Sequence, residues 1–192
     1  MDKKQVCENI EFLVDTLIEN VPDYFKFHGE TATELFLNDN LKIDTPIDIC
    51  VNRRHIAELL GVIPKKYEIT MIHQNGRNQQ LEYIKLSQVH SLQVKKEDVL
   101  LLNIVIYDVD KDNWLFRLNH DIRLPEKQIY FHSIKWGVDY IKPEIVLMYA
   151  LKKPLNPKNI EFYRHLIDKM SYFQYVILKT VVGEESLNKI IK

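Results

Sequence analysis

The sequence predicts an α+β fold, in which a mixed β-sheet flanked by helices is followed by a helical C-terminal region. Three observations lead to this prediction. Apolar residues recur at helical spacing over residues 4–20, and strongly apolar or alternating segments follow between residues 24 and 132. From Pro143 onward the patterns are helical only. We therefore expect an α+β domain over residues 1–135 and a helical region over residues 136–192.

The first part of the chain alternates between helical and extended patterns. Pro22 ends the first helix, Gly29 turns the first strand into the second helix, and Gly61 closes the third helix. The expected helices are 4–20, 30–38 and 53–61, and the expected strands are 24–28 and 44–51. This alternation is typical of a sheet that is covered by helices.

The second part begins with a hairpin signal and ends in helices. Asn75-Gly76 predicts a tight turn between strands over 67–73 and 80–87. The segment 99–109 is the most apolar one, so we expect it at the centre of the sheet. Further strands are expected at 114–118 and 128–132, and helices are expected at 143–153, 157–170, 171–182 and 184–192.

Composition excludes several classes of protein. The 26 Lys and Arg residues nearly balance the 27 Asp and Glu residues, whereas nucleic-acid and membrane-surface binders usually carry a basic excess. The two cysteines, Cys7 and Cys50, form no CxxC pair, so neither zinc nor a disulfide framework is expected. The polar N-terminus and the lack of a long apolar stretch predict a cytoplasmic protein without a membrane span.

An acidic residue in an apolar strand is the strongest chemical signal. Asp48 lies between Ile47 and Ile49, and Pro46 precedes it by two residues. Carboxylates at positions i and i+2 share one face of a strand and can hold two metal ions, but Pro46 cannot bind metal. Asp44 shares the face by parity, although it lies roughly 13 Å from Asp48 along an extended strand. A structural alternative pairs Asp48 with a basic residue just beyond the strand, at positions 53–55.

Four segments carry a family resemblance: "FHGETATEL", "TPIDICV", "LLLNIVI" and "GVDYIKPEIVLMYALKKP". Together with the order of elements, they resemble the nucleotidyltransferase fold, and in particular the aminoglycoside 2''-adenylyltransferase type. They correspond to that family's glycine turn, its Asp-x-Asp strand, its strand with a third carboxylate and its Pro-Glu helix. The resemblance covers most of residues 20–170, and the last segment is the specific one.

The resemblance implies a nucleoside triphosphate and Mg²⁺ as cofactors. It places the nucleotide beside the glycine turn and makes Asp48 the metal ligand, with Asp44 as its nearby helper in catalysis. The turn residues Gly29, Glu30 and Thr31 would contact the nucleotide, and Lys42 and Arg77 are candidates for the basic walls of the cleft.

The chain departs from the family at the charged positions. Pro46 stands where the first carboxylate is expected, and Asn103 stands where the third is expected. An amide is a weak magnesium ligand and cannot act as a general base. Glu30 follows the turn glycine, and Ala150 replaces the lysine that follows the tyrosine of the family's last segment. These departures predict a degenerate active site with reduced or lost catalysis.

Three functions are consistent with this sequence. The first is a protein that binds a nucleotide or small molecule without turning it over. The second is an active Mg²⁺-dependent nucleotidyltransferase that modifies a hydroxyl group of a small, aminoglycoside-like acceptor. The third is a protein-interaction module, such as a homodimer or a toxin–antitoxin partner.

Overall fold

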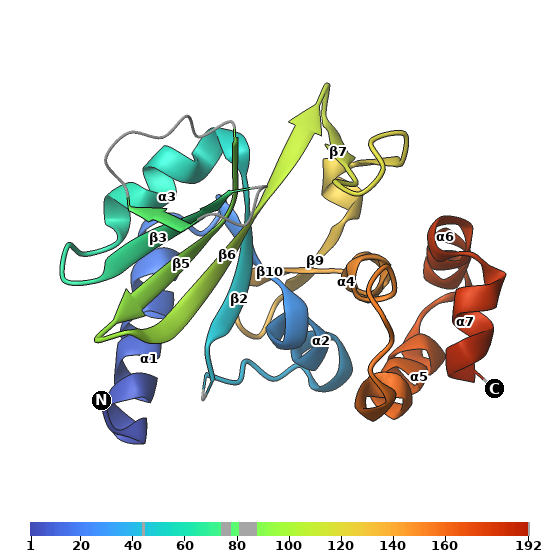
Figure 1. Ribbon diagram of the computed structural model, residues 1–192, viewed down its shortest axis with the longest axis horizontal. Helices are drawn as coiled ribbons and strands as arrows, with labels where there is room; N and C mark the ends of the chain where they lie inside the picture. Colours follow the sequence, from blue (N-terminus) through green and yellow to red (C-terminus); the bar gives the residue numbers. More distant parts are fainter. Residues whose placement is uncertain (44, 74–77, 81–87, 192) are drawn as a thin grey trace.

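The computed structural model describes residues 1–43, 45–73, 78–80 and 88–191. In the described residues, helices and strands alternate as far as Val62, the regular elements from Glu68 to Ile141 are strands and one short 3-10 helix, and the later ones are helical (Figure 1). The helices are α1 (Lys3–Asn20), α2 (Gly29–Asn38), α3 (Ile56–Val62), α4 (Pro143–Ala150), α5 (Ile160–Lys169), α6 (Tyr172–Val182) and α7 (Glu184–Ile191). The strands are β1 (Phe25–Phe27), β2 (Ile47–Asn52), β3 (Glu68–His73), β4 (Asn78–Gln80), β5 (Val89–Lys96), β6 (Val99–Asp110), β7 (Asn113–Leu115), β8 (Arg123–Pro125), β9 (Tyr130–Ser133) and β10 (Val138–Ile141).

The strands form a mixed sheet in the order β4-β3-β5-β6-β2-β1-β10-β9. β2 pairs with β6 and β1 pairs with β10 in parallel, and the other pairs along this path are antiparallel. β7 and β8 extend from the end of β6. The α+β class is thus confirmed, and the apolar strand expected at 99–109 lies in the middle of the sheet as β6.

The two faces of the sheet bury different sets of helices. Alternate residues of β2, Ile47, Ile49 and Val51, pack in one core with α1 and α3. Cys50 faces the opposite way and packs in a second core that contains residues of α4 to α7. Figure 1 shows α1 and α3 on one side of the sheet and α2 and α4 on the other. The predicted alternation of β2 therefore places Asp48 on the α4 side.

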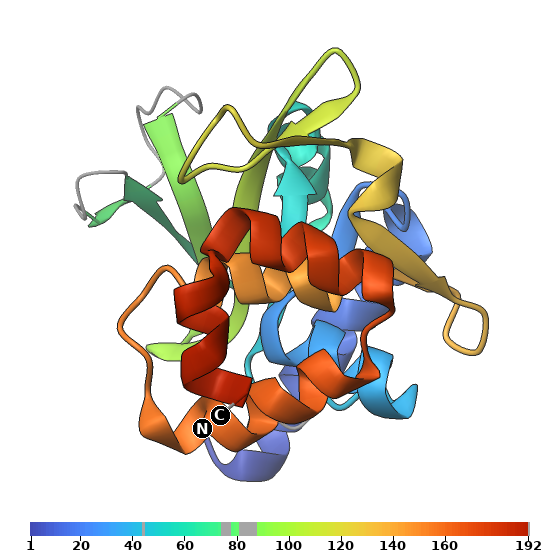
Figure 2. The ribbon, with the colours of Figure 1, turned by 90° about the vertical axis from the view of Figure 1, so that its right-hand side faces the viewer.

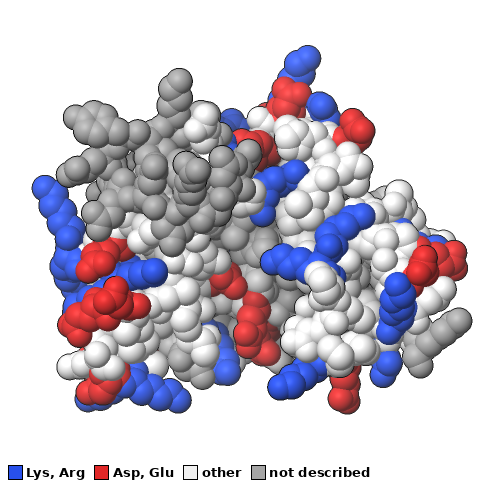
Figure 3. Space-filling view, in the orientation of Figure 1, with Lys and Arg blue, Asp and Glu red and all other residues white. Residues whose placement is uncertain are grey.

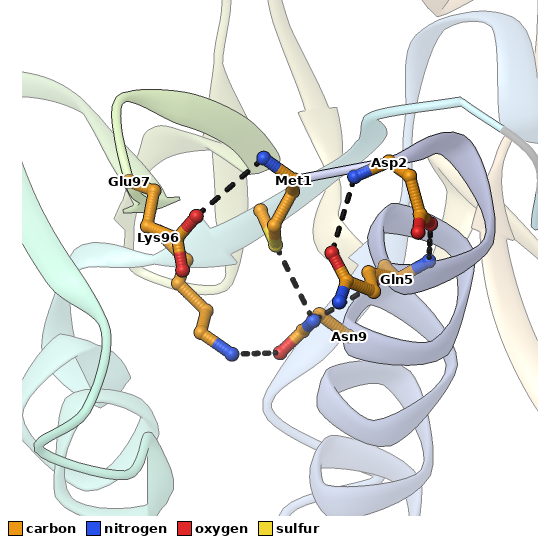
Figure 4. A network of polar contacts seen from close by, with 6 residues as sticks. All are labelled: Met1, Asp2, Gln5, Asn9, Lys96 and Glu97. Atoms are coloured by element: carbon orange, nitrogen blue, oxygen red, sulfur yellow. Dashed lines mark hydrogen bonds and ion pairs between the residues drawn. The ribbon is translucent and has the colours of Figure 1, made fainter.

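Hydrogen bonds connect the N-terminal helix to the end of β5 and to the residue before β3. Asp2 and Gln5 form a capping box that satisfies the free N–H groups at the start of α1 (Figure 4). Asn9 accepts hydrogen bonds from the Lys96 ammonium at 3.2 Å and from the Tyr67 hydroxyl at 3.1 Å. These bonds fix how α1 lies on the sheet.

The C-terminal helices form a layer of their own. Figure 2 shows α5, α6 and α7 lying over α4, with which α5 and α6 make contact. At the start of α6, Ser171 and Gln174 form a capping box. Gln174 also donates a 2.7 Å hydrogen bond to Glu144, a buried carboxylate in the first turn of α4. This bond joins the two helices.

Three strands were not expected from the sequence: β5, β8 and β10. β5 lies between β3 and β6, and β10 lies between β1 and β9. β3 and β4 pair antiparallel, whereas the Asn75-Gly76 turn and most of the strand expected at 80–87 lie outside the described residues. No helix in the described part of the chain combines the length and hydropathy needed to cross a bilayer.

Candidate functional site

The site is centred on a pair of polar side chains in the middle of the sheet. Asp48 of β2 and Asn103 of β6 are partners in the parallel register. The Asn103 amide donates a 2.8 Å hydrogen bond to the Asp48 carboxylate. Adjacent strands in register present paired side chains on the same face, which explains why residues 55 positions apart meet here.

The glycine turn lies directly against this pair. Gly29 begins α2 with a φ of +56°, a backbone conformation that side chains other than hydrogen strongly disfavour. A Cβ placed on Gly29 would lie 3.1 Å from both Cβ and Cγ of Asp48 and closer still to its carboxylate oxygen. The His28 N–H donates to the Asp48 carbonyl at 2.8 Å. Both the conformation and the neighbouring carboxylate therefore require glycine at this position.

Burial shapes the titration of the polar groups at this turn. It raises the pKa of the Asp48 carboxyl, and the hydrogen bond from Asn103 offsets part of that rise. Burial, together with the nearby charge of Arg117, lowers the pKa of His28 to about 4. His28 is therefore neutral at pH 7, and Asp48 is harder to ionise than an exposed aspartate.

The residues at this turn fit a two-metal site poorly. Within the described ranges, no three His, Cys, Asp or Glu side chains gather in a metal-binding group. The Asn103 amide directs its NH₂ group at Asp48, and Asp44 lies outside the described residues. A raised carboxyl pKa also weakens metal binding, because the ligand must be deprotonated. Asp48 beside the turn and Glu30 within it are carboxylates of the described chain, and no third ligand joins them in a metal-binding group there.

A cavity of about 400 Å³ opens next to the glycine turn. It lies between the start of α2 and the helices α4 and α5. Its lining consists of Gly29, Glu30, Thr33, Val146, Leu147, Ala150, Asn159, Phe162, Tyr163 and Leu166. Figure 3 shows acidic and basic side chains near the middle of this face, between the sheet and the C-terminal helices. The cavity is large enough for a small ligand.

The residues expected at the site are only partly brought together. Gly29 and Glu30 line the cavity, and Gly29 contacts Asp48. Thr31 is buried, and Lys42 is exposed in the segment between α2 and β2. Arg77, like Asp44, lies outside the described residues.

The basic residues after β2 have partners other than Asp48. Arg53 forms a two-pronged ion pair with Asp108, at 2.6 and 3.0 Å. Arg54 lies 3.6 Å from Glu126, and the ring of His55 stacks on Tyr24. The expected pairing of Asp48 with a basic residue at positions 53–55 is therefore not the one observed, and Asp48 is hydrogen-bonded to Asn103 instead.

Two residues near the turn were not singled out from the sequence. The ring of Tyr149, from α4, lies 6.3 Å from the ring of His28, measured between centroids. The Arg117 guanidinium lies 5.6 Å from the centroid of the Tyr149 ring. Arg117 follows β7 in a loop, and no sequence pattern indicated that this loop reaches α4.

Comparison with solved structures identifies the fold. The chain resembles ANT(2")-Ia, solved in complex with adenylyl-2"-tobramycin, with a TM-score of 0.58 and 14% sequence identity over 93% of this chain and 97% of that one. It also resembles the lincosamide antibiotic adenylyltransferase LnuA, solved with lincomycin bound, with a TM-score of 0.53 and 13% identity over 91% and 97% of the two chains. No protein-family model matches the sequence, and no curated protein matches it. At these identities the likeness establishes the fold alone.

Proposed function

We propose that this protein, whose chain has the nucleotidyltransferase fold, binds a nucleotide or small molecule in the cleft beside Gly29, with reduced or lost nucleotidyl transfer. The observation that carries the proposal is the Asp48–Asn103 pair, in which an amide stands at the position that the family resemblance gives to a third carboxylate. Binding needs the cleft, whereas transfer needs the carboxylates as well.

The chemistry explains why an amide matters here. In nucleotidyl transfer an acceptor hydroxyl attacks the α-phosphorus of a nucleoside triphosphate, and pyrophosphate leaves. Mg²⁺, when bound, neutralises the phosphate charge. A general base must take the hydroxyl proton, and Asn103 cannot accept it. Asp48 therefore lacks a carboxylate on the neighbouring strand with which to share the roles of metal ligand and base.

Two features support ligand binding at this place. The cavity beside the turn has the size of a small-molecule site, and its lining mixes apolar helix residues with Glu30, Thr33 and Asn159. The two solved structures of the same fold hold an adenylylated aminoglycoside and a lincosamide, respectively. A nucleotide or a small hydroxylated molecule is the ligand class that this cleft would take.

Isothermal titration with ATP, GTP, CTP and UTP, with and without Mg²⁺, tests the proposal. We expect at least one nucleotide to bind and Mg²⁺ to tighten its binding. Asp48→Ala should remove the effect of Mg²⁺ but leave metal-free binding in place. Asp139→Ala, which removes another partly buried carboxylate of the sheet, is the matched control. Absence of binding by all four nucleotides would refute a nucleotide-binding function.

Pyrophosphate release distinguishes reduced from full catalysis. With aminoglycoside and lincosamide acceptors, we expect release by the wild-type protein to be slow or undetectable. Restoring carboxylates with Pro46→Asp and Asn103→Asp should increase it. Rapid release by the wild-type protein would show that Asp48 suffices and that the enzyme is active.

A further inference from the structure

A half-buried guanidinium with two unpaired nitrogens lies near the proposed site. In the described part of the chain, Nε and Nη1 of Arg117 are both buried and make no hydrogen bond. An arginine cannot give up its charge at physiological pH, so its unpaired N–H groups carry the full penalty of desolvation. Burial lowers the pKa of Arg117, which expresses the same penalty. Such a group is stabilised when an anion binds to it.

The surroundings of Arg117 leave its charge uncompensated. Asp108 is the carboxylate that acts on it, but Asp108 is already held at 2.6 and 3.0 Å by Arg53. Tyr149 contributes the face of its ring and is un-ionised, because burial raises its pKa to about 12. His90 also has a buried Nδ1 without a partner, and burial together with the charges of Arg117 and Arg53 lowers its pKa.

Tyr149 connects this cluster to the glycine turn. Its ring contacts Arg117 at 5.6 Å and lies 6.3 Å from the ring of His28, which immediately precedes Gly29. The charge of Arg117 is close enough to His28 to lower its pKa. Tyr149 thus links Arg117 to the start of α2, whose first N–H groups also favour anions.

We propose that Arg117, which lies outside the lining of the cavity, binds the polyphosphate group of a nucleoside triphosphate held beside the glycine turn. The inference rests on the proposed nucleotide-binding function and identifies the residue that recognises the phosphates. Arginine suits this role because its planar fork donates two parallel hydrogen bonds to phosphate oxygens. The face of Tyr149 holds the guanidinium plane in place.

The test uses inorganic tripolyphosphate, the tightest-binding nucleoside triphosphate and its parent nucleoside as probes, in calorimetric titrations. Arg117→Met should weaken the binding of tripolyphosphate and of the nucleotide at least tenfold, with little effect on the nucleoside. Arg117→Lys should retain part of the affinity. Arg123→Met is the matched control, because Arg123 is half-exposed and pairs with Asp110 at 3.0 Å. We expect this control to leave binding unchanged.

A thermal melt of each ligand-free variant separates binding from a structural role. Without ligand, Arg117→Met should be at least as stable as the wild type, because it removes a buried unpaired charge. A large fall in its melting temperature would instead show that Arg117 holds the fold together, and would overturn the inference.

The outcomes also separate this inference from the proposed function. If the nucleotide binds wild type and Arg117→Met equally well, the inference fails and the nucleotide-binding function stands. If tripolyphosphate binds through Arg117 but no nucleotide binds, the anion site stands and the nucleotide-binding function fails. Failure of tripolyphosphate to bind the wild-type protein would refute the anion site.

Discussion

Gly29 links backbone conformation to site chemistry at a single position. We expect Gly29→Ala to destabilise the protein by about 2–4 kcal/mol, because the new methyl group meets both a positive φ and the Asp48 side chain. Gly137 is the matched control: it has a φ of +63°, but nothing lies within 4 Å of its added Cβ. Gly137→Ala should cost only the backbone penalty, about 1–2 kcal/mol. Urea unfolding of both variants measures the difference.

Equal losses in these two variants would contradict a close packing of Gly29 on Asp48. If the packing is real, adding Asp48→Gly to Gly29→Ala should recover part of the lost stability, because it removes the side chain that the methyl group meets. The same substitution added to Gly137→Ala should give no such recovery.

His28 should make stability depend on pH. Its pKa is about 4 in the folded protein and near 6.5 when unfolded, so the unfolded state binds more protons between these values. The stabilisation is therefore complete above about pH 7 and is lost as pH falls toward 4, by about 3 kcal/mol. His28→Gln should show a shallower loss of unfolding free energy over this range in urea titrations.

The same replacement at His165, an exposed residue of α5, is the control for this experiment. It should leave the pH profile of the wild type in place. Identical profiles for His28→Gln and wild type would show that His28 is as accessible to protons in the folded state as in the unfolded one.

Single residues also show what the sequence could predict. The family resemblance assigned Asn103 to the position of a third carboxylate, and the structure places it beside Asp48 as its strand partner. Adjacent strands in register present such paired side chains on the same face of the sheet. The proximity of Arg117 to Tyr149 was not predicted, because it depends on the path of a loop, which has no periodicity.

At the scale of elements, one side chain joins two helices. Gln174 completes the capping box of α6 and also donates to buried Glu144 in α4. Ser171→Ala should cost about 1 kcal/mol, the usual value of a helix cap. Gln174→Ala should cost about 1–3 kcal/mol more, because it also leaves a buried carboxylate without its partner. Chemical denaturation of the two variants compares these costs.

If both substitutions cost the same, the bond between Gln174 and Glu144 contributes nothing to stability. The double variant Gln174→Ala/Glu144→Leu gives a further check. It replaces a broken polar pair by apolar groups and should be more stable than Gln174→Ala alone.

The strands missed in the sequence were missed for different physical reasons. β5 carries Lys95 and Lys96 at its end, and a register shift opposite Ile72 and His73 interrupts its alternation. β10 is only four residues long, and its strand character comes from pairing with β1 and β9. Longer elements such as α1 and β6 have enough periodic positions to be recognised. Short ones are determined by their neighbours in space.

At the scale of the whole molecule, the sequence predicted the layers of sheet and helices but not the composition of the candidate site. Apolar patterns specified a sheet with helices on both faces and helices at the end, and the structure has this arrangement. The site depends instead on where β1, β2, β6, α4 and the loop after β7 meet. That meeting point is a property of the folded chain, because its residues come from segments far apart in the sequence.

The position of β10 also governs the order in which the protein can assemble. β1 is entirely buried, yet one of its edges is covered by a strand that is more than 110 residues away along the chain. A polypeptide still emerging from the ribosome would expose that edge until Ile141 was available. Folding should therefore be slow for a protein of this size. The chain must lose the entropy of closing this large loop before the contacts between β1 and β10 can stabilise it. The cleft, whose far wall comes from α4 and α5, would be the last part to form.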